Sequence, residues 1–185
     1  SRRGEGNPRR QARDPETDAP GSGADGSASS SSNGTMSLLD GATPQWPYIS
    51  SELRAQIETA ADPARSLEER LEAFEDILDS EVGDTNMARA RNLEREVGLR
   101  QIYLKFDGGN PTGTQKDRIA FAQAMDALRR GFEAITIASC GNYGAAVALA
   151  TSLAGLRCVV FVPAGYHTRR LEEMRAFGAD IRRVP

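Results

Sequence analysis

The pattern of apolar positions predicts two short amphipathic helices before residue 80. Apolar residues recur at helical spacing from Leu53 to Ala60, and Pro63 then interrupts the pattern. Ser66 and Glu69 follow with the spacing of a capping box. The second apolar stripe consists of Leu71, Phe74, Ile77 and Leu78. We expect both helices to be packing elements that carry no chemistry.

After a further short helix over 92–98, strand-like apolar runs alternate with helical patterns. The predicted strands are 101–106, 134–139, 157–163 and 180–184, and the predicted helices are 116–131, 142–155 and 167–178. This alternation is typical of βαβ units, so we predict the α/β fold class, with three layers and an open, mainly parallel sheet. Right-handed crossovers would place the strand-to-helix turns at the carboxyl edge of the sheet, where ligands bind.

Composition divides the chain into three predicted segments. Up to Met36 the sequence has no bulky aliphatic or aromatic side chain, so it cannot offset the entropy of ordering itself. We therefore expect residues 1–36 to be a disordered tail or to lie upstream of the protein's start. Residues 37–80 form the predicted N-terminal helical extension, and residues 81–185 form the α/β domain.

Charge and residue usage narrow the function. The formal net charge of −3 gives no electrostatic case for nucleic acid or for an anionic membrane as the partner. No apolar run is long enough to span a bilayer. Cys140 and Cys158 lack metal-ligand spacing and follow no signal sequence, which favours the reducing cytoplasm. His167 is the single histidine, so we expect no metal site.

The segment NPTGTQKDR, residues 110–118, is the first candidate for chemistry. Its first four residues are typical of a turn, and Lys116 then falls in the first turn of a predicted helix. A cation is disfavoured there because the amino end of a helix favours anions. This placement suggests that Lys116 is a nucleophile, although a solvated surface lysine would fit the same pattern.

The segment ASCGNYGAA, residues 138–146, is the second candidate. A strand ends at Ser139 and a helix begins near Asn142, so free backbone N–H groups would face the turn. Such a turn binds a carboxylate or a phosphate well, and the side chains of Ser139 and Asn142 could orient the anion. An ordinary strand-to-helix turn, with Gly141 and Gly144 serving close packing, is the alternative.

The two segments together, in this order and separated by one helix and one strand, resemble the fold type II pyridoxal-phosphate enzymes, the tryptophan synthase β-like group. Its members include threonine synthase, cysteine synthase and the serine and threonine dehydratases. The resemblance implies that Lys116 binds pyridoxal 5'-phosphate as a Schiff base and that Asn142 bonds the phenolic oxygen of that cofactor. It also implies that the substrate carboxylate binds to Ser139, Cys140, Gly141 and Asn142.

The resemblance is nearest to threonine synthase, because residues 83–113 also look like the segment that precedes the lysine there. Asn86, Gln115 and Tyr143 depart from the usual residues, and a bulky Tyr143 beside the cofactor would narrow the choice of substrate. The glycine-rich loop that holds the cofactor phosphate in this group would lie downstream of Pro185. We therefore expect 81–185 to be the N-terminal part of an incomplete catalytic domain.

The function implied by the resemblance is a cytoplasmic lyase of amino-acid metabolism that acts on a small amino-acid substrate. Elimination and replacement that convert phosphohomoserine to threonine are the first expectation. β-Replacement of the cysteine-synthase kind, or a serine or threonine dehydratase, is the alternative within the group. A truncated and inactive α/β module that binds a ligand is the alternative outside it. A homodimer is compatible with each of these functions.

Overall fold

The computed structural model describes residues 49–185, and its centre is a three-stranded parallel sheet in the order β3-β4-β5. The strands are β3 (Ala134–Ala138), β4 (Arg157–Pro163) and β5 (Asp180–Val184). Ile137 of β3 pairs with Val160 of β4, which pairs with Ile181 of β5. The predicted α/β class with a mainly parallel sheet is therefore confirmed.

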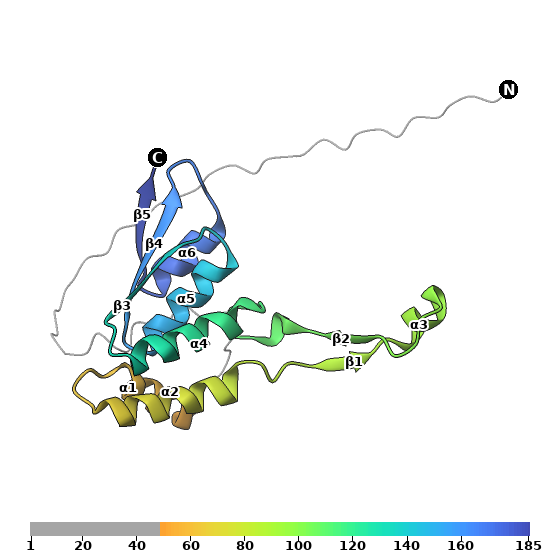
Figure 1. Ribbon diagram of the computed structural model, residues 1–185, viewed down its shortest axis with the longest axis horizontal. Helices are drawn as coiled ribbons and strands as arrows, with labels where there is room; N and C mark the ends of the chain where they lie inside the picture. Colours follow the sequence, from red (N-terminus) through yellow and green to blue (C-terminus); the bar gives the residue numbers. More distant parts are fainter. Residues whose placement is uncertain (1–48) are drawn as a thin grey trace, which may run out of the picture. The chain divides into compact units, whose positions relative to one another are not determined.

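Three helices cover one face of this sheet (Figure 1), namely α4 (Lys116–Arg129), α5 (Asn142–Leu153) and α6 (Arg169–Ala176). The β4 side chains of Cys158, Val160 and Val162 are buried on the helical face, whereas Val159 and Phe161 on the opposite face are only half-buried. Helix α5 is apolar all round, which suits its central position between α4, α6 and the sheet. It therefore supplies much of the core.

The two N-terminal helices, α1 (Ser51–Ala61) and α2 (Leu67–Glu81), pack on α4 and α5. The predicted capping box is present: the Ser66 hydroxyl accepts from the Glu69 amide, and the Glu69 carboxylate accepts from the Ser66 amide. Arg70 ties this pair to the core, because its guanidinium donates to the carbonyl oxygens of Ala60 at 3.0 Å and of Ala154 at 2.8 Å. Both helices thus pack against the helices that cover the sheet.

One predicted strand lies outside the parallel sheet. Residues 101–106 contribute only β2 (Tyr103–Lys105), which pairs antiparallel with β1 (Met87–Arg89). The expectation that this segment belongs to the βαβ series is therefore wrong. The chain between the two strands forms α3 (Arg91–Val97), close to the predicted helix over 92–98, and the helix ends at Gly98 in the left-handed conformation. A single turn of 3-10 helix, η2 (Asp107–Gly109), follows β2.

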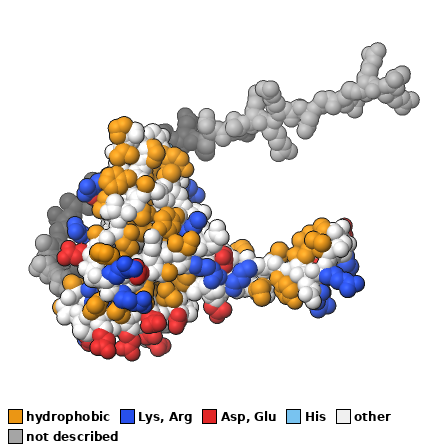
Figure 2. All heavy atoms as spheres, in the orientation of Figure 1, with side chains coloured by type: hydrophobic (Ala, Val, Ile, Leu, Met, Phe, Trp, Pro, Cys, Tyr) orange, Lys and Arg blue, Asp and Glu red, His pale blue; other side chains and the backbone are white. Residues whose placement is uncertain are grey.

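The β1–β2 hairpin is rich in exposed apolar side chains. Figure 1 shows it running away from the helices, and Figure 2 shows apolar side chains gathered along it. Phe106, at its base, is 67% exposed, and Met87 is 62% exposed. No residue of β1, β2 or α3 belongs to the buried core. The core of residues 49–185 therefore forms without this hairpin.

Of the three predicted segments, the tail over 1–36 lies outside the described residues. The boundary between the helical extension (37–80) and the α/β domain (81–185) stays a prediction. Helix α2 ends at Glu81, next to that boundary. None of the helices formed by residues 49–185 has the length and apolar character needed to cross a membrane.

The turn between α5 and β4 gives a test of the packing of α1. Gly155 has a φ of +64°, and a Cβ added there would lie 2.3 Å from the Ala61 carbonyl oxygen. We expect Gly155→Ala to lower the free energy of unfolding by about 2–4 kcal/mol, because backbone strain and a backbone clash add together. Urea denaturation measures this change.

Gly131→Ala is the matched control for the strain. Gly131 has a φ of +73°, but nothing lies within 4 Å of an added Cβ. We expect this variant to lose only about 1–2 kcal/mol, which is the cost of the left-handed conformation alone. Equal losses in the two variants would contradict the close contact between Gly155 and α1.

Candidate functional site

The loop over 110–115 is held by a buried asparagine. The Asn110 side chain is fully buried; its Oδ1 accepts from the Gly83 amide at 2.9 Å, and its Nδ2 donates to the Asp107 carbonyl oxygen at 2.9 Å. Asn110 thereby ties the loop to the chain that enters β1 and to the turn that leaves β2. Asn110, the first residue of the predicted turn, is thus a buried residue that connects the loop to both ends of the hairpin.

The other end of the loop is held by the buried carboxylate of Asp117, in the first turn of α4. It accepts from the Thr112 hydroxyl at 2.8 Å, from the Thr112 amide at 3.1 Å and from the Thr114 amide at 3.4 Å. Burial raises the pKa of Asp117 above its usual range, and the bonds from Thr112 oppose that rise. Asp117 therefore fixes the path of the loop into the helix.

Lys116 is the first residue of α4 and is half-buried. Its Nζ makes no hydrogen bond or ion pair with any residue between 49 and 185. The sequence contains only one other lysine, Lys105, whose Nζ donates to the carbonyl oxygens of Gly83 and Thr85 at 3.3 Å and 2.5 Å. One lysine is thus committed to structure, and the amine of the other is available.

The second candidate turn leaves three backbone amides open. The Ser139 hydroxyl accepts from the Gly144 amide at 3.0 Å and so closes the first turn of α5. Within the described part of the chain, the amides of Gly141, Asn142 and Tyr143 have no acceptor. A Cβ added at Gly141 would meet nothing within 4 Å, so the turn is open on that side. This geometry suits a carboxylate or a phosphate at the amino end of α5.

The two cysteines differ in their surroundings. Cys140 is half-buried and packs against the core beside this turn, while Cys158 is buried in β4. Burial raises the pKa of the Cys158 thiol, so it is a poor nucleophile and serves packing. Tyr143 lies on the core side of the turn, and its hydroxyl donates to Oε1 of Gln123 on α4.

Arg170 brings the two candidate segments together. Its Nε donates to Oδ1 of Asn142 at 2.9 Å, and its Nη2 donates to the Thr112 carbonyl oxygen at 3.3 Å. One guanidinium thus joins the turn before α5 to the loop before α4. Sequence reasoning missed Arg170, because these contacts join residues 28 and 58 positions apart. The bond between Thr112 and Asp117 was not predicted either, although a threonine five positions before an aspartate is a local signal for it.

An ion pair between Arg118 and Asp107 fixes the base of the hairpin next to the loop over 110–115. Arg118 Nη2 donates to the Asp107 carboxylate at 2.9 Å and to the Gly83 carbonyl oxygen at 3.0 Å. The bond from Arg118, with a second from the Thr85 hydroxyl, lowers the pKa of Asp107 below its usual range. The start of α4 is therefore tied to the residues that flank the hairpin, Gly83 before β1 and Asp107 after β2.

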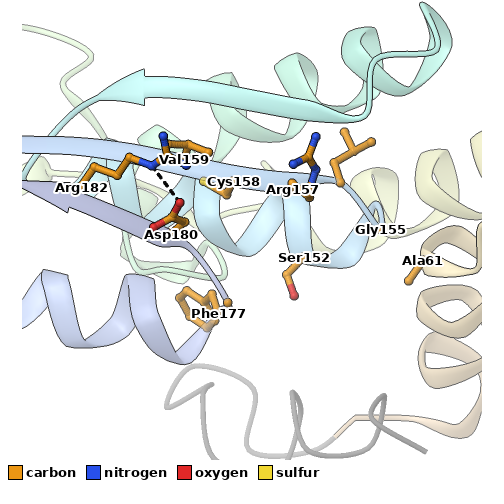
Figure 3. A pocket seen from close by; sticks show the side chains of 11 residues that line it. Ala61, Ser152, Gly155, Arg157, Cys158, Val159, Phe177, Asp180 and Arg182 are labelled. Atoms are coloured by element: carbon orange, nitrogen blue, oxygen red, sulfur yellow. Dashed lines mark hydrogen bonds and ion pairs between the residues drawn. The ribbon is translucent and has the colours of Figure 1, made fainter.

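A pocket among the described residues lies elsewhere (Figure 3). It has a volume of about 470 Å³ and is lined at the amino ends of β4 and β5 by residues that include Arg157, Cys158 and Asp180. The Ser139–Asn142 turn follows the carboxyl end of β3, so the pocket is at the opposite end of the strands. None of the predicted site residues lines it, and the carboxyl edge remains the candidate site.

The Asp117 network gives a stability test for the loop. Replacing Asp117 with alanine leaves the buried Thr112 hydroxyl and two loop amides without their acceptor. We expect the free energy of unfolding to fall by about 2–4 kcal/mol. Asp126→Ala on the same helix removes an exposed pair with Arg130 and should change it by less than about 0.5 kcal/mol. Similar losses in the two variants by urea denaturation would show that Asp117 does not anchor the loop.

The Asp107–Arg118 pair gives a pH test. Because its folded-state pKa lies below the usual 3.8, Asp107 adds stability above that pH, and this contribution disappears as the pH falls through the folded-state pKa. We expect the stability difference between the wild type and Asp107→Asn to shrink as the pH is lowered below about 3.8 in urea titrations. In an Arg118→Met background most of this pH dependence should vanish. An unchanged dependence in that background would refute the pairing.

Comparison with known proteins finds that the chain is similar to two amino-acid synthases and to a pyridoxal 5'-phosphate-dependent racemase. Threonine synthase of Methanocaldococcus jannaschii is 35% identical over 103 residues, which cover 55% of this chain and 25% of that protein. Cysteine synthase B of Escherichia coli is 31% identical over 108 residues, covering 56% of this chain and 35% of that protein. The crystal structure of a pyridoxal 5'-phosphate-dependent aspartate racemase superposes with a TM-score of 0.52 at 29% identity, covering 61% of this chain and 36% of that one.

The chain therefore spans only about a quarter to a third of the length of the relatives it matches. The model of the pyridoxal-phosphate dependent enzyme family matches residues 78–185, which are more than half of this sequence. It includes both candidate segments and every residue of the site described above. The chain belongs to the pyridoxal-phosphate dependent enzyme family, with the fold of its type II members.

Proposed function

We propose that the protein is a pyridoxal-phosphate-dependent enzyme of amino-acid metabolism and that Lys116 holds its cofactor. The observation that carries the proposal is the difference in hydrogen bonding between the amines of Lys105 and Lys116. Lys105 is bound to backbone carbonyls, whereas Lys116 is half-buried with an amine that has no partner among residues 49–185. A half-buried, available amine at a fixed helix start suits a residue that must react with a carbonyl group.

The turn before α5 suits the rest of the ligand. The open amides of Gly141, Asn142 and Tyr143 could hold the substrate carboxylate, with Ser139 keeping the turn closed and Cys140 at its side. The Asn142 side chain could donate from Nδ2 to the phenolic oxygen of the cofactor, since only its Oδ1 is engaged. The residues present thus fit the amine, ring and carboxylate contacts of such a site.

When bound, pyridoxal phosphate supplies an electron sink for the carbanion chemistry of amino acids. The chain's own residues would orient the substrate and move protons. The Lys116 amine would take a proton from the substrate Cα and return one to Cβ. The α5 amides would hold the carboxylate during this transfer, and Asp117 would keep the lysine's helix start in place.

We place the reaction among eliminations and replacements at the β or γ carbon, catalysed by a lyase in the cytoplasm. Threonine formation from phosphohomoserine is the first candidate, because a threonine synthase is among the relatives with the higher identity. Cysteine-synthase-like β-replacement and dehydration of serine or threonine are the outcomes to be tested against it. Assays of the three reactions on the protein expressed from its complete reading frame would separate them.

Borohydride trapping tests the proposed lysine. The protein from the complete reading frame is mixed with pyridoxal 5'-phosphate, reduced and digested. We expect the label on the peptide that contains Lys116, and we expect Lys116→Ala to abolish both the label and the visible absorbance band. The same variant should lower kcat by at least about 10³-fold, because it removes the proton carrier along with the attachment point.

Lys105→Arg is the matched control, because arginine preserves the positive charge and cannot form a Schiff base. We expect it to retain the label on Lys116 and the visible band. A visible band that survives Lys116→Ala, or a label on Lys105, would overturn the assignment. A protein that binds no cofactor at all would instead favour the non-enzymatic α/β module.

A further inference from the structure

The side chain of Arg170 is placed between the elements that carry the candidate site. Arg170 is the second residue of α6, and its side chain is 25% exposed. Its three guanidinium nitrogens each have a separate partner: Nε meets Asn142, Nη2 meets Thr112, and Nη1 meets Glu173 of its own helix. A planar guanidinium with fixed donors is well suited to hold several groups in one geometry.

The contact with Asn142 determines which way its amide faces. The terminal torsion of asparagine is roughly two-fold, so either the oxygen or the nitrogen could face a ligand. A cationic donor at 2.9 Å from Oδ1 favours one orientation, in which the oxygen faces Arg170. The Nδ2 group, which has no acceptor among residues 49–185, is then presented as a donor on the other side.

The contact with Thr112 fixes this amide relative to the loop that precedes Lys116. Thr112 is buried and is held on both sides, since its carbonyl accepts from Arg170 and its hydroxyl donates to Asp117. The charges that face Arg170 are the carboxylates of Asp117 and Glu173. Arg170 thus connects α6, the turn before α5 and the loop before α4.

We propose that Arg170 is a positioning residue of the cofactor site, which orients the Asn142 amide so that Nδ2 donates to the anionic ring oxygen of the cofactor. This inference rests on the proposed function and adds a residue to it. Arg170 acts through Asn142 and does not touch the cofactor itself. A merely structural link between α6 and the loop would stabilise the fold without affecting the electronic state of the cofactor.

The test is the pH titration of the visible band of the protein loaded with pyridoxal 5'-phosphate. A hydrogen bond donated to the anionic ring oxygen of the cofactor stabilises the anion and lowers its affinity for a proton. Arg170→Met frees the Asn142 amide to turn, so the midpoint of the titration should rise, by about half to one pH unit. Equilibrium dialysis of the unloaded protein should show a rise of about tenfold in the Kd for pyridoxal 5'-phosphate.

The double variant separates positioning from structure. In an Asn142→Ala background, Arg170→Met should shift the midpoint no further, because the group through which it acts is absent. Arg175→Met, on the same helix at an exposed position, should leave both the midpoint and the Kd unchanged. If Arg170→Met does not fold, Arg170→Lys should show a smaller shift in the same direction, since one ammonium cannot serve both Asn142 and Thr112.

Two results would overturn the inference while leaving the proposed function in place. The first is a band that depends on Lys116 but has the same midpoint in the wild type and in the Arg170 variants. The second is an equal shift from Arg170→Met with and without the Asn142 side chain. Failure of the proposed function looks different, because the band would then survive Lys116→Ala.

Discussion

The structure of the candidate site depends on one buried carboxylate. Asp117 sits in the first turn of α4, loses its contact with water and receives donors from Thr112 and Thr114 in return. A buried carboxylate of this kind is costly unless its partners are in place, so the loop has few alternative conformations. The neighbouring residue is Lys116, and the rigid loop therefore determines where its amine is presented.

The second constraint is that the loop before α4 does not follow a strand of the parallel sheet. It follows β2, which belongs to the separate hairpin, and is held to the rest of the molecule by side chains. Asn110 and Arg118 connect it to the base of the hairpin, and Arg170 connects it to the turn before α5. We expected the parallel sheet to position the loop before α4. Side-chain hydrogen bonds from Asn110, Arg118 and Arg170 position it instead.

Much of the framework could be predicted from the sequence because its signals are local. The capping box of Ser66 and Glu69, the left-handed Gly98 and the apolar runs of β3, β4 and β5 each depend on residues within a few positions. The hairpin could not be predicted in the same way. Three-residue strands carry almost no periodicity, and the residues 101–106 do not reveal which strand they pair with.

The site itself was only partly accessible to sequence reasoning. The segments that contain Lys116 and Asn142 were identified by their motifs, and the structure brings both segments to Arg170. The roles of Asp117 and Arg170 are visible only in the folded structure, because a charged residue on a helix surface and one that reaches another element have the same sequence pattern. Long-range polar contacts of this kind are not encoded in spacing.

We propose that the loop before α4 and the turn before α5 form one cofactor site. Hydrogen exchange of the protein from its complete reading frame, measured with and without pyridoxal 5'-phosphate, tests it most directly. If the two segments form one site, the peptides covering residues 110–118 and 139–145 gain protection together when the cofactor is added. Protection of neither peptide, or protection confined to the pocket at the amino ends of β4 and β5, would contradict it.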